Sequence, residues 1–275
     1  MNQSKTVLVT GSSTGIGRET ALHFLAQGWN VAATMRTPER SDLPQDPKLF
    51  SPRLDVTISA TIEEAFRQTQ AKFGSIDVVI NNAGYGLTGP FEGAEEDEIK
   101  RQFDTNVFGL MRVSKTAIRH WREAGQKGTL VNVASMGGRL TVPYYSVYHS
   151  TKWAVEGFTE SLQYEVESLG IRVKLVEPGA IRTDFYERSA QLTDTNAPHE
   201  YQDLLKVARL NMNEAGKRGT HPTKVAATIY AASASSGRQL RFTVGQDAKM
   251  LLGLRRMLPE SAFYGLVRSQ IFKKA

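Results

Sequence analysis

The chain has 275 residues, of which 40% are hydrophobic and 23% charged, and it contains no cysteine. This composition is typical of a globular protein and excludes a disordered or fibrous chain, while the lack of cysteine excludes disulfides, thiolate catalysis and cysteine zinc sites. The net charge of +6 gathers at the C-terminus, because residues 249–275 hold six basic residues and one acidic residue. Residues 1–248 therefore carry a net charge of only +1, and we expect no nucleic-acid partner.

Apolar segments are too short to cross a membrane, since none approaches about 20 consecutive apolar residues. A strand-like run begins within the first ten residues and leaves no room for a signal peptide. We therefore expect a soluble, cytoplasmic protein, and no motif in the chain suggests a metal site.

Short apolar runs rich in β-branched residues alternate with helical patterns along the chain. Five runs predict buried parallel strands at residues 6–10, 30–35, 76–81, 129–134 and 171–177, with a weaker candidate at 50–56 and a late one at 239–244. The stretches at 15–27, 58–73, 95–124, 147–169 and 223–233 predict helices. This alternation predicts an α/β fold, a doubly wound parallel sheet of the Rossmann type with helices on both faces. We assign residues 1–248 to this single domain, with residues 182–198 as a candidate lid.

Residues 249–275 extend past that domain as a basic amphipathic segment. Leucines precede Pro259 and further apolar residues follow it, which predicts two short helices broken at the proline. A segment of this kind packs over the substrate cleft or against a second subunit, or it lies on an anionic membrane surface. Packing is the favoured interpretation, because the apolar residues suffice to dock the helices on the body.

The first strand leads into a glycine-rich turn, Gly11-Ser12-Ser13-Thr14-Gly15-Ile16-Gly17, and then a helix. Glycines let the backbone approach a pyrophosphate closely, and the N-terminus of the helix supplies N–H groups and a positive dipole end. The strand before the turn and the helix after it favour a dinucleotide site over an ordinary tight turn.

The end of the second strand distinguishes NAD from NADP. An acidic residue there binds the ribose 2′-hydroxyl of NAD, whereas an arginine accommodates the 2′-phosphate of NADP. The chain has Thr34-Met35-Arg36 at this point, with no carboxylate. Arg36 therefore predicts NADP(H), and Ser12 and Ser13 in the neighbouring loop are expected to donate to the same phosphate.

Tyr148 and Lys152 lie four residues apart in a predicted helix, so both side chains emerge on one face. An ammonium next to a tyrosine stabilises the phenolate, which makes Tyr148 a candidate general acid/base. Ser135 lies 13 residues upstream, at the carboxyl end of a predicted strand, where α/β sheets bind ligands. The three residues together predict a catalytic site.

With these motifs in order, residues 5–245 resemble the short-chain dehydrogenase/reductase family, in its single-domain branch. The matching positions are those of the glycine loop, the acidic residue after the third strand region, the segment after the next strand, a helix asparagine, the catalytic residues and the turn after a later strand: Gly11, Gly15, Gly17, Asp55, Val56, Asn82, Ala83, Gly84, Asn106, Ser135, Tyr148, Lys152, Pro178, Gly179 and Thr183.

The resemblance implies a role for each of the matching residues. Ser135 would polarise the substrate carbonyl, and Tyr148 would pass a proton to its oxygen as hydride leaves the nicotinamide. Lys152 would hold the ribose hydroxyls and tune Tyr148, while Asn106 would position a water that connects Lys152 to solvent. On the cofactor, Asp55 would hold the adenine amino group and Thr183 would contact the carboxamide.

The segments at 86–92 and 135–148 resemble most closely the retinol- and hydroxysteroid-type members of the family. They imply a bulky, apolar ketone or secondary alcohol as the small-molecule substrate, in a homodimer or homotetramer. Candidate walls of the pocket are Tyr85, Leu87, Leu140, Tyr144, Tyr145, Phe185 and Tyr186.

Two alternatives to this carbonyl reductase or alcohol dehydrogenase remain. A non-catalytic NADP-binding sensor on the same fold would not need a serine, a tyrosine and a lysine in register, yet all three are present. Family members that act on sugar nucleotides usually have another glycine spacing, and enoyl reductases usually separate the tyrosine and lysine further. Both are disfavoured.

Overall fold

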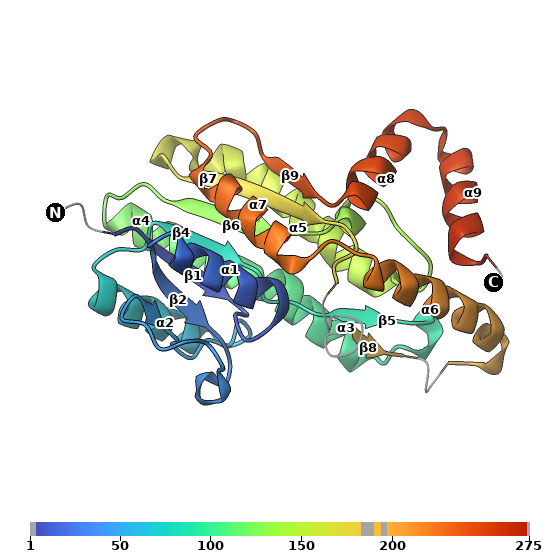
Figure 1. The fold of residues 1–275 in the computed structure, drawn as a ribbon, viewed down its shortest axis with the longest axis horizontal. Helices are drawn as coiled ribbons and strands as arrows, with labels where there is room; N and C mark the ends of the chain where they lie inside the picture. Colours follow the sequence, from blue (N-terminus) through green and yellow to red (C-terminus); the bar gives the residue numbers. More distant parts are fainter. Residues whose placement is uncertain (1–3, 183–189, 194–196, 274–275) are drawn as a thin grey trace.

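A seven-stranded parallel sheet forms the centre of the protein, described by a computed structural model that covers residues 4–182, 190–193 and 197–273 (Figure 1). The strand order is β3-β2-β1-β4-β6-β7-β9, and all pairs are parallel. The strands are β1 (Thr6–Thr10), β2 (Asn30–Thr34), β3 (Leu49–Phe50), β4 (Val78–Asn81), β6 (Thr129–Val133), β7 (Arg172–Pro178) and β9 (Arg241–Val244). Every residue of β1, β4 and β6 is buried, as their continuous apolar runs predict.

Helices cover both faces of the sheet, which confirms the doubly wound α/β fold. On one face, α1 (Gly15–Ala26) and α7 (Pro222–Ala234) pack against each other and the strands through Phe24, Val225 and Ile229. On the other face, α2 (Ser59–Phe73), α4 (Leu110–Glu123) and α5 (Ser146–Val166) form a second core around Trp121, which is fully buried.

The predicted helix at 95–124 is three segments. An α-helix, α3 (Glu96–Phe103), passes into a π-helical turn (Asp104–Gly109) and then into α4. A π turn adds one residue per turn to a helix and often occurs at functional sites. The hydrophobic period does not reveal this insertion, because it continues on either side of the turn.

Several elements were not expected from the sequence. A small parallel sheet pairs β5 (Gly86–Thr88) with β8 (Ala190–Leu192), and α6 (Gln202–Lys217) follows it. Short 3₁₀ turns lie at Pro38–Arg40, Phe91–Gly93, Met136–Gly138, Glu167–Leu169 and His199–Tyr201. Most of the candidate lid at 182–198 lies outside the described residues.

The C-terminal segment forms two helices, α8 (Gln246–Met257) and α9 (Glu260–Ile271), and Pro259 separates them as predicted. Phe263 is fully buried and packs with Val267 against Leu140, while Asn211 of α6 donates from Nδ2 to the carbonyl of Ile271 at 2.8 Å. The apolar face of α9 therefore packs on the body, on the opposite side of the molecule from the N-terminus (Figure 1). None of the helices within the described ranges has the length and apolarity that a bilayer crossing requires.

Candidate active site

The glycine loop after β1 has a shape that only glycines permit. Gly11 and Gly15 have φ angles of +68° and +56°, in the left-handed region. A Cβ atom on Gly17 would lie 2.1 Å from the carbonyl oxygen of Gly11, and one on Gly11 would lie 2.9 Å from Cα of Ala83. The close approach of these backbones, at the N-terminus of α1, fits a pyrophosphate-binding cradle.

Thr10 and Asn82 join the glycine loop to the end of β4. The hydroxyl of Thr10 accepts hydrogen bonds from the backbone N–H groups of Asn82 (3.0 Å) and Ala83 (3.1 Å). The side-chain amide of Asn82 donates in return to the carbonyls of Thr10 (2.9 Å) and Gly11 (3.1 Å). Asn82 and Ala83 thus lie at the predicted cofactor site, next to the exposed Gly84. Sequence reasoning missed Thr10, which looked like an ordinary strand end.

The structure corrects the expectation for Ser12. Its side chain is fully buried, its hydroxyl donates to the carbonyl of Val9 at 2.9 Å, and its N–H donates to the carbonyl of Thr34. Ser13 is exposed, so it is the serine of the pair whose hydroxyl is accessible to a phosphate. Arg36 is also exposed at the end of β2 and forms no ion pair with another described residue.

The residues predicted for the adenine side lie at the end of the β3 region. Asp55 is partly buried, and its Oδ1 accepts from the N–H (2.9 Å) and hydroxyl (2.7 Å) of Thr57. Val56 is buried, with its Cγ2 2.7 Å from where a Cβ on Gly109 would lie. Ile16 is partly buried against the core. The side chains of Val56 and Ile16 thus pack inward.

Tyr148 and Lys152 lie on the first turns of α5, as predicted. Lys152 is buried, its Nζ donates to the carbonyl of Val133 at 3.0 Å, and Nζ lies 5.8 Å from the ring centroid of Tyr148. Burial lowers the pKa of Lys152 to about 8, and the carboxylate of Glu156 acts in the opposite direction.

Ser135 follows β6 and begins a 3₁₀ turn, where its Oγ accepts from the N–H of Gly137 at 3.0 Å. Since the oxygen serves as acceptor in that bond, the hydroxyl proton is available for donation to a ligand. The turn packs against His149 of α5, because a Cβ on Gly137 would lie 2.6 Å from Cδ2 of His149 and 3.4 Å from Oγ of Ser135.

Asn106 lies in the π turn and connects two parts of the site. Its Oδ1 accepts from the N–H of Tyr85 (3.0 Å), and its Nδ2 donates to the carbonyl of Tyr85 (2.8 Å) and to Oγ1 of Thr151 (3.1 Å). The hydroxyl of Thr151 donates in turn to the carbonyl of Tyr148 at 2.7 Å. Asn106 thus ties the segment after β4 to the turn of α5 that carries Tyr148. Thr151 was not predicted.

The turn after β7 contains Pro178 and Gly179, as predicted. The N–H of Gly179 donates to the carbonyl of Val244, and a Cβ on Gly179 would lie 2.4 Å from both carboxylate oxygens of Asp247. Asp247 in the first turn of α8 accepts from the N–H of Ala180 at 2.6 Å. Asp247 therefore fixes this turn, an unpredicted role. Thr183 lies outside the described residues.

The predicted pocket walls are only partly in place. Leu87 and Leu140 are each 2% exposed and belong to the interior, so the expectation that they line a pocket is corrected. Tyr145 is buried and stacks on His149, with ring centroids 5.6 Å apart. Tyr85 is partly buried beside Asn106. Phe185 and Tyr186 lie outside the described residues.

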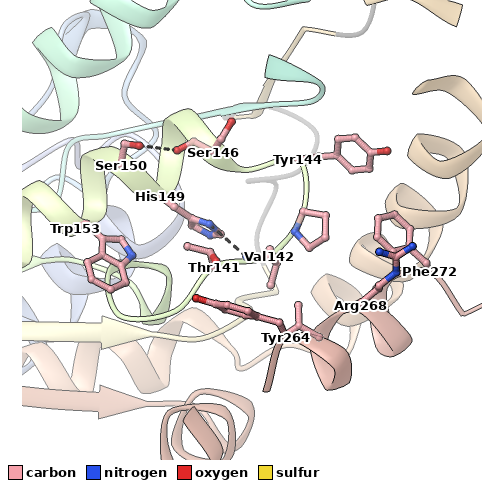
Figure 2. Close-up of a pocket in the computed structure, with 12 residues that line it drawn as sticks. Thr141, Val142, Tyr144, Ser146, His149, Ser150, Trp153, Tyr264, Arg268 and Phe272 are labelled. Carbon is pink, nitrogen blue, oxygen red and sulfur yellow. Dashed lines mark hydrogen bonds between the residues drawn. The ribbon is translucent and has the colours of Figure 1, made fainter. Parts of the chain in front are cut away.

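A cavity of about 730 Å³ lies between α5, the loop at 141–144 and α9. Figure 2 shows Tyr264, Arg268 and Phe272 of α9 facing the loop and the start of α5. Tyr144 lines it with a φ of +66°, and His149 forms its inner wall. The α5 residues Ser146, Ser150 and Trp153 define its helix face, whereas Tyr148 and Lys152 emerge on another. This cavity is therefore separate from the candidate catalytic residues.

A parallel Rossmann-type sheet with a glycine loop after β1, a serine after β6 and a tyrosine and lysine one turn apart defines a dinucleotide-dependent oxidoreductase. The family model described as short chain dehydrogenase matches residues 5–193. The chain belongs to the short-chain dehydrogenase family, and this membership supports a nicotinamide cofactor.

Individual relatives agree with this assignment. The chain is 34% identical over 251 residues to a 3-ketodihydrosphingosine reductase of Bacteroides thetaiotaomicron, covering 90% of this chain and 91% of the relative. A short-chain dehydrogenase from Streptomyces avermitilis has a similar crystal structure, with a TM-score of 0.80, 32% identity and coverage of 98% and 96%. ElxO, solved with NADP bound, has a TM-score of 0.71 at 26% identity and coverage of 87% and 97%.

Proposed function

We propose that the protein is an NADP(H)-dependent oxidoreductase that interconverts a ketone or aldehyde with an alcohol. The observation that carries the proposal is the placement of the buried Lys152 ammonium 5.8 Å from the ring of Tyr148, one helical turn away. A sensor of the cofactor has no need for this pair, and the position of Ser135 at the end of β6 adds a hydrogen-bond donor for a carbonyl oxygen.

The chain's residues fit the cofactor in two places. The cradle formed by Gly11, Gly17 and Ala83 leaves no room for side chains and suits a pyrophosphate. Arg36 is an exposed cation where the 2′-phosphate of NADP is expected, with Ser13 exposed nearby in the loop. The likeness to ElxO, which binds NADP, adds support.

In the direction of reduction, the bound cofactor supplies a hydride to the carbonyl carbon. Tyr148 gives its hydroxyl proton to the carbonyl oxygen, so that the alcohol forms and a phenolate is left on the enzyme. The Lys152 ammonium stabilises that phenolate, and Ser135 donates a hydrogen bond to the same oxygen as it becomes negative. In this proposal Asn106 holds the tyrosine-bearing turn in place and positions a water for reprotonation.

The proposed substrate is bulky and apolar, of the hydroxysteroid, retinoid or aryl ketone kind. The relative named 3-ketodihydrosphingosine reductase is, by its name, a ketone reductase, which supports the carbonyl class. We further propose that α8 and α9 form an extension of the domain at 1–248, and that the protein is a cytoplasmic homodimer or homotetramer. Exposed aromatic residues on α5, Trp153 (47%) and Tyr164 (71%), support a subunit contact on that helix.

The proposal is tested by measuring NADPH oxidation against a panel of ketones, aldehydes and enoyl thioesters. We expect turnover of a bulky ketone or aldehyde. Tight binding of NADPH with no turnover of any carbonyl would instead favour the non-catalytic sensor, and turnover of enoyl thioesters alone would favour an enoyl reductase.

A further inference from the structure

A buried ionic cluster lies one helical turn beyond Lys152, on the side away from Tyr148. Glu156 of α5 is 5% exposed and Glu177 of β7 is fully buried. Arg241 of β9 joins them, with its Nε 3.0 Å from Oε2 of Glu156 and 3.3 Å from Oε1 of Glu177. Charged groups are rarely buried without a reason beyond stability, because removing them from water is costly.

The position of Glu156 is fixed on every side. A Cβ on Gly138 would lie 2.7 Å from Cγ of Glu156 and 2.9 Å from the carbonyl oxygen of Lys152. The glycine thus lets the turn that starts at Ser135 press directly onto the helix between these two residues. Any displacement of Glu156 would reach both Lys152 and this turn.

The negative charge of Glu156 is only partly neutralised by its partners. Arg241 is shared among Glu156, Glu177 and Glu160, and Arg139 contacts Glu177 at 3.3 Å. The hydroxyl of Thr243 also donates to Glu177, at 2.7 Å. By contrast, Oε1 of Glu156 is buried and makes no hydrogen bond within the described part of the chain. On its own helix the charged groups that neighbour Glu156 are Lys152 and Glu160.

Residues four apart on a helix are neighbours on its surface, so the Glu156 carboxylate favours the ammonium form of Lys152. Burial, with Glu177 second, raises the pKa of Glu156 to about 7, and burial lowers that of Lys152 to about 8. Above neutral pH Glu156 is therefore mostly ionised, in the range where Lys152 loses its proton.

We propose that Glu156 is a positioning residue for Lys152, whose carboxylate, anchored by Arg241, keeps the Lys152 ammonium protonated and directed at the carbonyl of Val133. The inference rests on the proposed function, in which protonated Lys152 stabilises the Tyr148 phenolate. It adds that the working pH range of the enzyme at its alkaline end depends on a residue that touches neither cofactor nor substrate.

The test is the pH profile of kcat/KM for NADPH, which reports the titrating groups of the free enzyme. Glu156→Gln and the apolar Glu156→Leu remove the charge, and Glu156→Asp keeps it. Glu160→Gln is the matched control, because it removes a carboxylate from the same helix and the same arginine at a solvent-exposed position two turns from Lys152. Thermal unfolding and NADPH binding verify that each variant is folded.

We expect the alkaline limb to move about one pH unit lower in either neutral variant, since one nearby opposite charge shifts a pKa by about that much or more. Glu156→Asp and Glu160→Gln should keep the limb near its wild-type position. A loss of stability with an unmoved limb in the folded neutral variants would overturn the proposal and leave Glu156 a structural residue. Failure of the proposed function is distinguishable, because the wild type itself would then oxidise no NADPH with any carbonyl.

Discussion

The side-chain amide of Asn82 donates from Nδ2 to the carbonyl oxygen of Gly11, at 3.1 Å, and so closes the glycine loop against the end of β4. A Cβ on Gly17 would intrude on both groups, at 2.1 Å from that oxygen and 2.5 Å from Nδ2. The cradle is therefore a three-way contact between β1, β4 and α1, and the absence of a side chain at residue 17 is a condition for its shape.

The first prediction follows from that contact. Gly17→Ala should weaken NADPH binding by at least tenfold, because the loop must shift to admit the methyl group. Isothermal titration with NADPH measures the effect. Gly157→Ala in α5 is the control, since a Cβ there meets no atom within 4 Å and alanine favours a helix. Equal NADPH affinity in the wild type and Gly17→Ala would contradict the assignment of the loop.

The second prediction concerns the proton donor. Tyr148→Phe keeps the ring and removes the hydroxyl, so turnover should fall by about 10²- to 10⁴-fold, as for general acid–base groups. NADPH binding should persist, because Lys152 and the glycine loop remain. Tyr164→Phe, at a 71% exposed position of the same helix, should leave turnover unchanged. Near-wild-type turnover in Tyr148→Phe would show that another residue supplies the proton.

The third prediction concerns cofactor choice. A charge-assisted contact between Arg36 and a 2′-phosphate contributes about 1.5–3 kcal/mol, so Arg36→Gln should raise the Kd for NADPH about ten- to a hundredfold. The Kd for NADH should stay the same, and the exposed Arg256→Gln on α8 should change neither. Arg36 is the position to alter, because Met35 is only 3% exposed and an aspartate there would bury a charge. Equal affinity of the wild type for both cofactors would rule out the role of Arg36.

Much of this site could be predicted because its signals are local. Buried parallel strands are continuous apolar runs, as in β1 and β6, and the boundaries of these strands agree with prediction to within one residue. Tyr148 and Lys152 share a helix face whatever the rest of the fold does, because the helix period alone places them together. The two C-terminal helices followed from the proline between them in the same way.

Other features depend on contacts between residues far apart in the chain. Thr10 meets Asn82 across 72 positions, and Asp247 meets Ala180 across 67. Neither has a pattern of its own in the sequence. Ser12 was misassigned because the direction of its hydroxyl is set by the turn geometry, and Leu140 because its cover, Phe263, comes from the end of the chain.

The fourth prediction concerns pH and His149. Burial lowers the pKa of His149 from 6.5 to about 4. Since the unfolded chain then binds the proton more readily, the stability that neutral His149 contributes is present above pH 6.5 and is lost as the pH falls toward 4. The loss between pH 7 and pH 5 is about 2 kcal/mol. Burial raises the pKa of Glu156, which gives the opposite slope in this range, so the wild type alone does not isolate His149.

The measurement is therefore a difference between two proteins. Urea unfolding of the wild type and of His149→Asn, at pH 7 and pH 5, should show the variant losing less stability on acidification, by about 2 kcal/mol. His199→Asn, at an exposed position, should behave as the wild type does. Identical pH dependence in the wild type and His149→Asn would mean that His149 is not held neutral by the fold.

The last prediction concerns the extension formed by α8 and α9, which packs on the body through Phe263, Val267 and Leu140. The loop at 141–144 that α9 covers leads from Ser135 to Tyr148. Phe263→Ala removes a fully buried ring, at a typical cost of about 3–5 kcal/mol, and should release α9 from the loop. We expect KM for a bulky ketone to rise at least severalfold, with KM for a small aldehyde unchanged and with faster proteolysis in residues 246–273.

Met257→Ala, at an 80% exposed position of α8, is the matched control and should leave both KM values and proteolysis unchanged. Wild-type protein should also remain in the supernatant when it is sedimented with anionic vesicles, because the apolar face of α9 is already occupied by the body. Salt-sensitive co-sedimentation of the wild type, lost on deletion of residues 250–275 while the kinetics stay the same, would assign the basic extension to a membrane surface instead.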